Sequence, residues 1–148
     1  MSKNRYVNTK FWDDSFIITL DPIEKLLFLY FLTNPLTELG GAYEISLRRV
    51  AFDTGIDSEM VAKILNRFAH ANKMIYRDGW ILIVNFQSHQ AMNPNVRLGV
   101  ERSLSHCPDW IKQRLSKPFE AFETQSHSYL DLDSNLNSNL NSNSNELT

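Results

Sequence analysis

Residues 40–86 decide the fold and read GGAYEISLRRVAFDTGIDSEMVAKILNRFAHANKMIYRDGWILIVNF. Apolar residues in the middle of this stretch recur at i, i+3, i+4 and i+7, which places them on one face of a helix. The spacing predicts a helix over residues 57–72 with a buried stripe of Val61, Ile64, Leu65 and Phe68. Two apolar runs follow, and Asp78-Gly79 between them is the preferred pair for a type I′ turn. We therefore predict a hairpin over residues 74–84.

A strand and a helix are predicted just before this helix. Residues 42–45 have the composition of a short strand, and Ser46 can cap a helix over residues 47–54. Gly55 supplies the left-handed residue that ends this helix. The order is then strand, helix, glycine turn, helix and hairpin.

An earlier helix begins at Asp21-Pro22-Ile23-Glu24. Asp21 can cap it, proline suits the first helical position, and Glu24 can complete a capping box. The helix should run to about Thr33, before Pro35. Because it is apolar nearly all round, we expect it at the centre of the core.

The C-terminal third of the chain changes character twice. We predict helices over residues 95–106 and 108–115. The first helix has an apolar edge that packs either within the chain or on a second copy, and we favour packing within the chain. That edge consists of Val96, Val100 and Leu104. Residues 117–148 are rich in Asn and Ser and are expected to be disordered, because they cannot bury enough apolar area. We therefore predict one domain over residues 1–116 and a tail.

The order of elements predicts an α+β winged helix-turn-helix with a C-terminal helical extension. The commonest use of that fold is to lay one helix in the major groove of DNA. The net charge of −2 conceals an asymmetry, since residues 1–118 contain 15 basic and 12 acidic side chains. Residues 119–148 contain five acidic side chains and no Lys or Arg. A basic body with an acidic tail is compatible with binding to phosphates.

The polar face of the helix over residues 57–72 is the first candidate DNA contact. Lys63 and Arg67 can contact phosphate or guanine, and Asn66 can bond adenine. Glu59 and His70 share this face. The alternative is an ordinary solvated face of an amphipathic helix.

Other basic residues are candidates for backbone contacts. Arg48 and Arg49 can anchor the domain on phosphates, or they serve only solubility. Arg77 and Lys73 can give the hairpin contacts to DNA, although Asp78 partly cancels the charge of Arg77. The alternative is a plain turn that closes a small sheet.

Several classes of function lack support in the sequence. No phosphate loop, nucleophile elbow or zinc-protease motif is present, so we expect no enzyme and no cofactor. The histidines have no paired spacing for a metal with Cys107, which is expected to be a small apolar filler. A lone cysteine, no apolar signal peptide and no membrane-spanning run predict a cytoplasmic protein.

Several short segments carry a resemblance to a known family. They are RYVNTKFW at residues 5–12, LDPIEKLLFLYFLTN at residues 20–34 and GAYEI at residues 41–45, together with VNF, HQ and NP between residues 84 and 94. In these segments the chain resembles the N-terminal winged-helix domain of phage and prophage replication initiators, the replisome-organiser or DnaD-like group. The resemblance covers roughly residues 5–115.

The resemblance implies origin binding and help in loading the replicative helicase in a bacterial host cell. It assigns DNA contacts to Lys63, Asn66, Arg67 and Arg77, and it implies double-stranded DNA and a helicase loader as partners. Longer relatives carry a C-terminal helical domain, whereas this chain continues into its Asn/Ser-rich tail. The low net charge leaves a protein–protein adaptor as an alternative. A transcriptional repressor shares the fold, and the apolar edge of residues 95–106 leaves a homodimer open.

Overall fold

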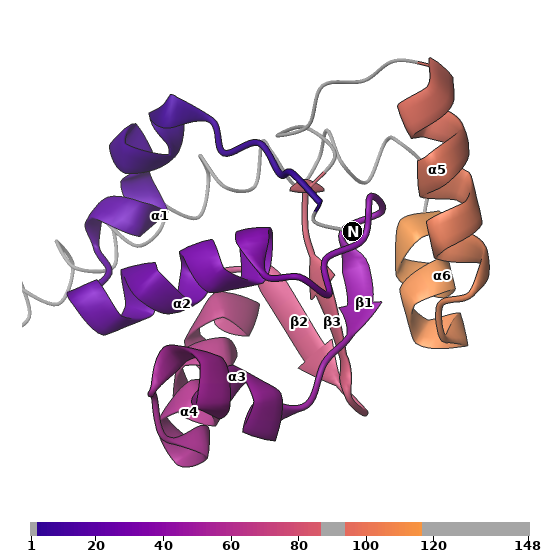
Figure 1. Ribbon diagram of the computed structural model, residues 1–148. Coiled ribbons are helices and arrows are strands. Elements are labelled where there is room, and N and C mark those ends of the chain that lie inside the picture. The colour runs from indigo at the N-terminus through magenta and orange to yellow at the C-terminus, as the bar shows by residue number, and fades with distance from the viewer. Residues whose placement is uncertain (1–2, 87–93, 117–148) are drawn as a thin grey trace, which may run out of the picture. The chain divides into compact units, whose positions relative to one another are not determined.

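The computed structural model describes residues 3–86 and 94–116 (Figure 1). The chain divides into two compact units, Met1–Pro108 and Asp109–Thr148. Within the second unit, the described residues form helix α6 (Asp109–Ser116). The predicted tail over residues 117–148 lies outside the described residues.

The first unit contains a three-stranded antiparallel sheet. Its strands β1 (Ala42–Glu44), β2 (Met74–Arg77) and β3 (Trp80–Ile83) lie in the order β1-β3-β2. Asp78 and Gly79 have φ values of 53° and 81°, as the predicted type I′ turn requires at both central positions. With its helices the unit is α+β, which confirms the predicted class.

The helices begin where the sequence offers caps. In α2 the Asp21 carboxylate accepts the Glu24 N–H at 2.8 Å, and the Glu24 carboxylate accepts the Asp21 N–H at 3.0 Å. Ser46 caps α3 and Asp57 caps α4 through their side-chain oxygens. The helices of the first unit are η1 (Thr9–Asp13), α1 (Ser15–Ile18), α2 (Pro22–Thr33), α3 (Leu47–Thr54), α4 (Ser58–His70) and α5 (Pro94–Ser105).

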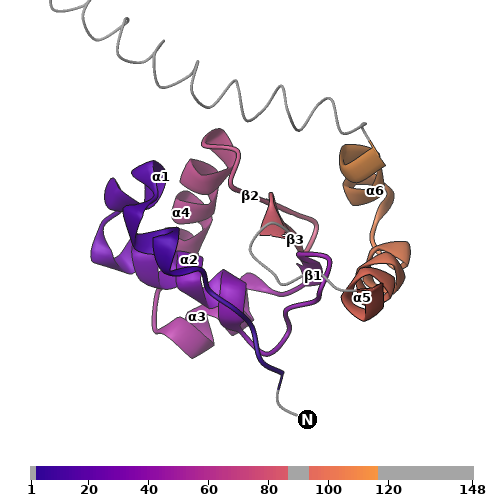
Figure 2. The ribbon, with the colours of Figure 1, turned by 90° about the horizontal axis from the view of Figure 1, so that it is seen from above.

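The main core lies between the sheet and helices α1 to α4, which occupy one side of the strands in Figures 1 and 2. Its largest fully buried side chains include Phe31 and Phe68. The expected position of α2 at the centre of the core holds for Leu27, Phe31 and Leu32, which are buried, but not for Ile23 and Leu26, which are each 49% exposed. One face of α2 therefore meets solvent and only the opposite face packs on the core.

Helix α5 packs on the loop before β1. The Leu104 side chain fills the space beside Gly40, and the Leu39 side chain lies against Gly99. Val100 is buried between these positions along the helix. The apolar edge of α5 thus packs within the chain, as we favoured.

Candidate nucleic-acid interface

The outer face of α4 is open to solvent. The predicted stripe from Val61 to Phe68 is buried, whereas Lys63 and Asn66 on the opposite face are exposed. The Lys63 ammonium makes no hydrogen bond or ion pair within the described part of the chain. The side chain of His70 is tied to its own helix, since its Nδ1 lies 2.8 Å from the Asn66 carbonyl oxygen. Lys63 and the Asn66 amide are therefore available to a ligand.

Arg67 has an intramolecular role that the sequence analysis missed. Its Nη1 donates to both carboxylate oxygens of Glu24, at 2.6 and 2.7 Å, and its Nη2 donates to the Thr19 carbonyl at 3.3 Å. Glu24 is buried and already belongs to the capping box of α2. Arg67 therefore joins α4 to the start of α2. The two partners lie 43 positions apart, so no local pattern signals the pair.

The two arginines of α3 differ in their surroundings. Arg49 Nε donates to Asp53 Oδ2 at 2.8 Å, and the Tyr30 hydroxyl of α2 donates to the same oxygen at 2.7 Å. The Tyr30 hydrogen bond, and then Arg49, hold the pKa of the Asp53 carboxyl below its usual value. Arg48 is exposed and contacts no charged partner among the described residues. Arg48 is thus the freer candidate for a phosphate contact.

The hairpin carries its two basic residues at opposite ends. Arg77 is exposed beside the turn and pairs across the sheet with Trp80. Lys73 precedes β2 at the base of the hairpin, where its ammonium lies 3.9 Å from Asp14 and 5.6 Å from the Phe16 ring centroid. The structure therefore does not bring Lys73 to the tip with Arg77.

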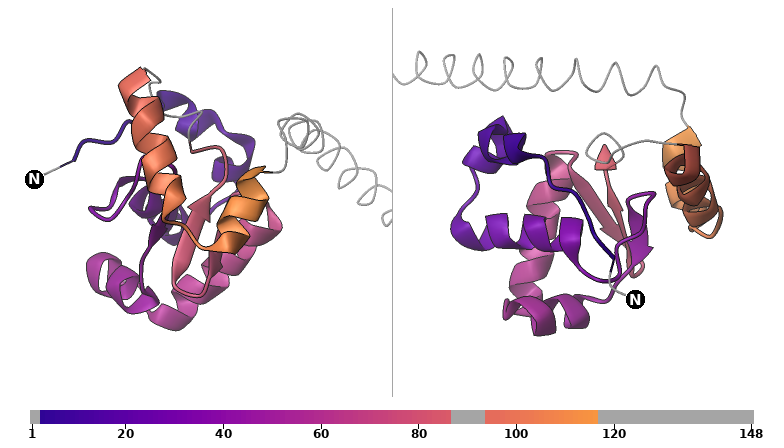
Figure 3. Two further views of the ribbon diagram at one scale, coloured as in Figure 1. Left: turned by 90° about the vertical axis from the view of Figure 1, so that its right-hand side faces the viewer. Right: turned by 45° about the horizontal axis from the view of Figure 1, so that its top comes forward.

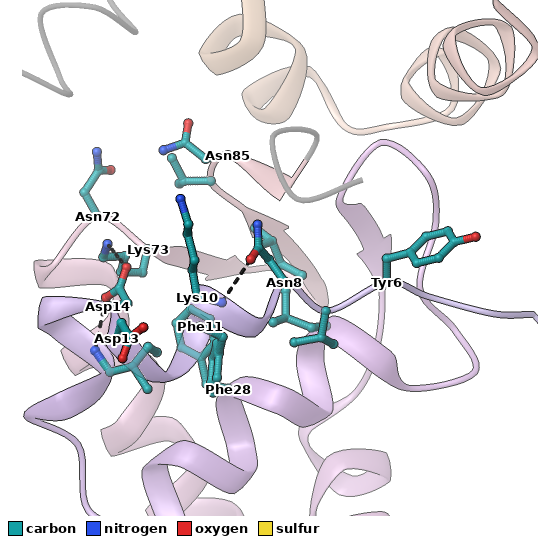
Figure 4. A pocket seen from close by; sticks show the side chains of 15 residues that line it. Tyr6, Asn8, Lys10, Phe11, Asp13, Asp14, Phe28, Asn72, Lys73 and Asn85 are labelled. Carbon is teal, nitrogen blue, oxygen red and sulfur yellow. Dashed lines mark hydrogen bonds and ion pairs between the residues drawn. The ribbon is translucent and has the colours of Figure 1, made fainter. Parts of the chain in front are cut away.

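A groove lies at the base of the hairpin, apart from the tip. It encloses about 570 Å³ between the N-terminal segment, the turn after α4 and the end of β3 (Figure 4). Its floor is apolar, whereas Lys10, Lys73, Asp13 and Asp14 give its rim charges of both signs. This groove was not predicted, because its lining comes from positions as far apart as Tyr6 and Asn85.

The described residues contain no metal-binding cluster and no membrane-spanning helix. Within residues 3–86 and 94–116, no group of three His, Cys, Asp or Glu side chains is placed to hold a metal ion. No described helix has the length and apolar character needed to cross a bilayer. No known protein family, curated protein or solved structure matches the chain.

Proposed function

We propose that this chain is a winged-helix protein that binds double-stranded DNA, with α4 as the recognition helix. The observation that carries the proposal is the exposed face of α4, where Lys63 and Asn66 lie opposite the buried stripe. The order β1, α3, α4, β2, β3 and the sheet order β1-β3-β2 are compatible with this fold. The type I′ hairpin then serves as the wing.

The proposed DNA contacts are of two chemical kinds, to base edges and to phosphates. Lys63 and Asn66 carry groups that can bond base edges in the major groove. Arg48 on α3 and Arg77 beside the hairpin turn provide cations for the phosphate backbone. Arg67 contributes mainly by holding α4 against α2 through Glu24. Few basic side chains are involved, so we expect moderate affinity that falls with salt.

We further propose that the DNA is a phage or prophage replication origin, which is supported by the sequence resemblance to replication initiators. A repressor would use the same contacts on an operator. The identity of the preferred DNA site separates these two functions. An adaptor would bind a protein in place of DNA, and the open groove is the feature that favours it.

Substitution of the α4 face tests DNA binding. We expect Lys63→Ala together with Asn66→Ala to weaken binding about tenfold or more, about 1.4 kcal/mol, because both ligand-facing groups are lost. Fluorescence anisotropy on labelled duplex DNA at two salt concentrations measures the change, and circular dichroism confirms folding. Lys112→Ala, an exposed lysine on α6, is the matched control. Equal affinity of the double variant and the control would refute the assignment of α4.

A further inference from the structure

We propose that the groove at the hairpin base binds a peptide segment of a partner protein. In that segment an apolar residue is followed by a residue with a carboxylate. The apolar side chain enters the groove and the carboxylate pairs with Lys10. This site lies apart from the proposed DNA contacts and does not depend on them.

The floor of the groove suits an apolar side chain. Side chains from η1, α1, α2 and β3 form it, and a volume of about 570 Å³ lies in the range of ligand sites. The apolar members at its base are Phe11, Ile17, Phe28, Leu32 and Ile83. Most of these side chains are themselves buried, so the half-buried Phe28 and the exposed Val7 present the apolar area from which a ligand would displace water.

Exposed apolar residues border the groove and favour a protein partner. Tyr6 is 69% exposed and lines the groove together with Val7, which is also exposed. Trp12 is exposed nearby, with its ring edge-on to Phe11 at 5.1 Å between centroids. Tyr and Trp are enriched in protein interfaces, and an exposed apolar cluster commonly marks one.

Lys10 supplies the complementary charge. Asn8 caps η1 by accepting the Lys10 N–H at 2.9 Å, which fixes where the lysine leaves the backbone. Its side chain extends between Asn8 and Asn85 in Figure 4, and its ammonium has no ion-pair partner among the described residues. A ligand carboxylate at the mouth of the groove would therefore meet an available cation.

The neighbouring carboxylates restrict the ligand to low negative charge. Asp14 is balanced by Lys73 and by the N–H groups of Phe16 and Ile17, at 2.8 and 3.1 Å. Asp13 adds an exposed negative charge to the rim. These carboxylates would repel the successive phosphates of a nucleic-acid backbone more strongly than a single peptide carboxylate, which the ammonium of Lys10 would attract.

The groove and the hairpin turn lie at opposite ends of the β2–β3 hairpin. Lys73, Ile83 and Asn85 mark the groove end, whereas Asp78 and Gly79 form the turn. Figures 1 and 3 show η1 and α1 at the end away from the turn. DNA at the turn would leave the groove open to a partner.

Short peptides test the groove. The probes are four acetylated, amidated hexapeptides, Gly-Ser-X-Asp-Ser-Gly, in which X is Leu, Ile, Phe or Trp. Heteronuclear NMR of the full chain, at peptide concentrations up to about 2 mM, maps where each probe binds and how tightly. We expect at least one probe to shift the resonances of Val7, Ile83 and Val84.

A charge exchange gives the decisive control. Lys10→Glu should weaken the best probe about tenfold, and replacing the probe's Asp by Lys should restore binding to this variant. Lys112→Glu, the same change on α6, should leave probe binding unaltered. No shift at the groove with any probe, or equal binding by the Lys10 and Lys112 variants, would overturn the proposal. The proposal would also be overturned if the peptides left these resonances unchanged while single-stranded DNA or a higher protein concentration shifted them.

Discussion

The Arg67–Glu24 pair gives a residue that was predicted to contact DNA a structural role within the fold. Arg67 lies on the flank of an amphipathic helix, where a basic residue usually meets solvent. In the structure its guanidinium is paired with a carboxylate that is buried beneath it. Removing the arginine would leave that carboxylate without its charged partner, which costs more than the loss of an exposed ion pair.

We expect Arg67→Met to destabilise the fold by about 1–2 kcal/mol. The value lies below that of a fully buried pair, because 45% of the Arg67 side chain is exposed and solvent screens the charge. Urea unfolding followed by circular dichroism measures the change. Arg48→Met, at an exposed position without a charged partner among the described residues, should change stability by less than about 0.5 kcal/mol. Equal losses in the two variants would contradict a stabilising role for the pair.

At the scale of elements, two glycines with a left-handed backbone conformation have different steric surroundings. Gly55 has φ of 74° and ends α3, and a Cβ there would meet nothing within 4 Å. Gly41 has φ of 75° beside β1, and a Cβ there would overlap the Phe86 Cβ. A side chain at either position would therefore strain the backbone, but only a side chain at Gly41 would also clash with a neighbouring residue.

Alanine substitution separates these two effects. Gly55→Ala should cost about 1 kcal/mol, the strain of a left-handed alanine. Gly41→Ala should cost at least about 2 kcal/mol more, because Phe86 is buried and has to move. Thermal and urea unfolding of both variants measures the difference. A similar loss in both would show that the loop at Gly41 relaxes freely.

Elements with local signals could be predicted from the sequence. The caps at Asp21, Ser46 and Asp57 and the turn at Asp78-Gly79 each act over a few residues, so the pattern alone locates them. Helix α3 was predicted with its observed bounds, whereas α4 ends at His70, two residues earlier than predicted.

Long-range features could not be predicted in the same way. Helices η1 and α1 were missed because they are short and their apolar residues pack on α2 and α4, although Asp14 caps α1. The partner of Arg67 and the lining of the groove depend on how distant segments meet. Exposure of Lys63 and Asn66 was predictable, because they lie opposite a regular apolar stripe.

At the scale of the whole molecule, two tyrosines connect α2 to its neighbours. The Tyr43 hydroxyl of β1 accepts the Asn34 amide and donates to the Phe31 carbonyl, each at 2.7 Å. Tyr30 connects α2 to α3 through Asp53. Burial is the main cause that raises the pKa of both tyrosines above the usual value of 10.

This shift predicts a loss of stability in alkali. Unfolded tyrosine releases its proton near pH 10, whereas folded Tyr43 retains it, so rising pH above 10 favours the unfolded state. Below pH 10 the contribution is fully present. We expect the free energy of unfolding to fall as pH rises above 10. In Tyr43→Phe this fall should be less steep, by about 1.4 kcal/mol per pH unit. Urea unfolding between pH 9 and 11.5 measures it, and an unchanged slope would contradict the inference.

The sequence contains a single cysteine, Cys107, and it is buried. Its Sγ lies 3.6 Å from the Ser103 carbonyl oxygen, which accepts its weak hydrogen bond. Reagents such as maleimides therefore reach this sulfur only slowly while the chain is folded. A dye attached through Lys63→Cys would label α4 selectively, and the native sequence would need no other change.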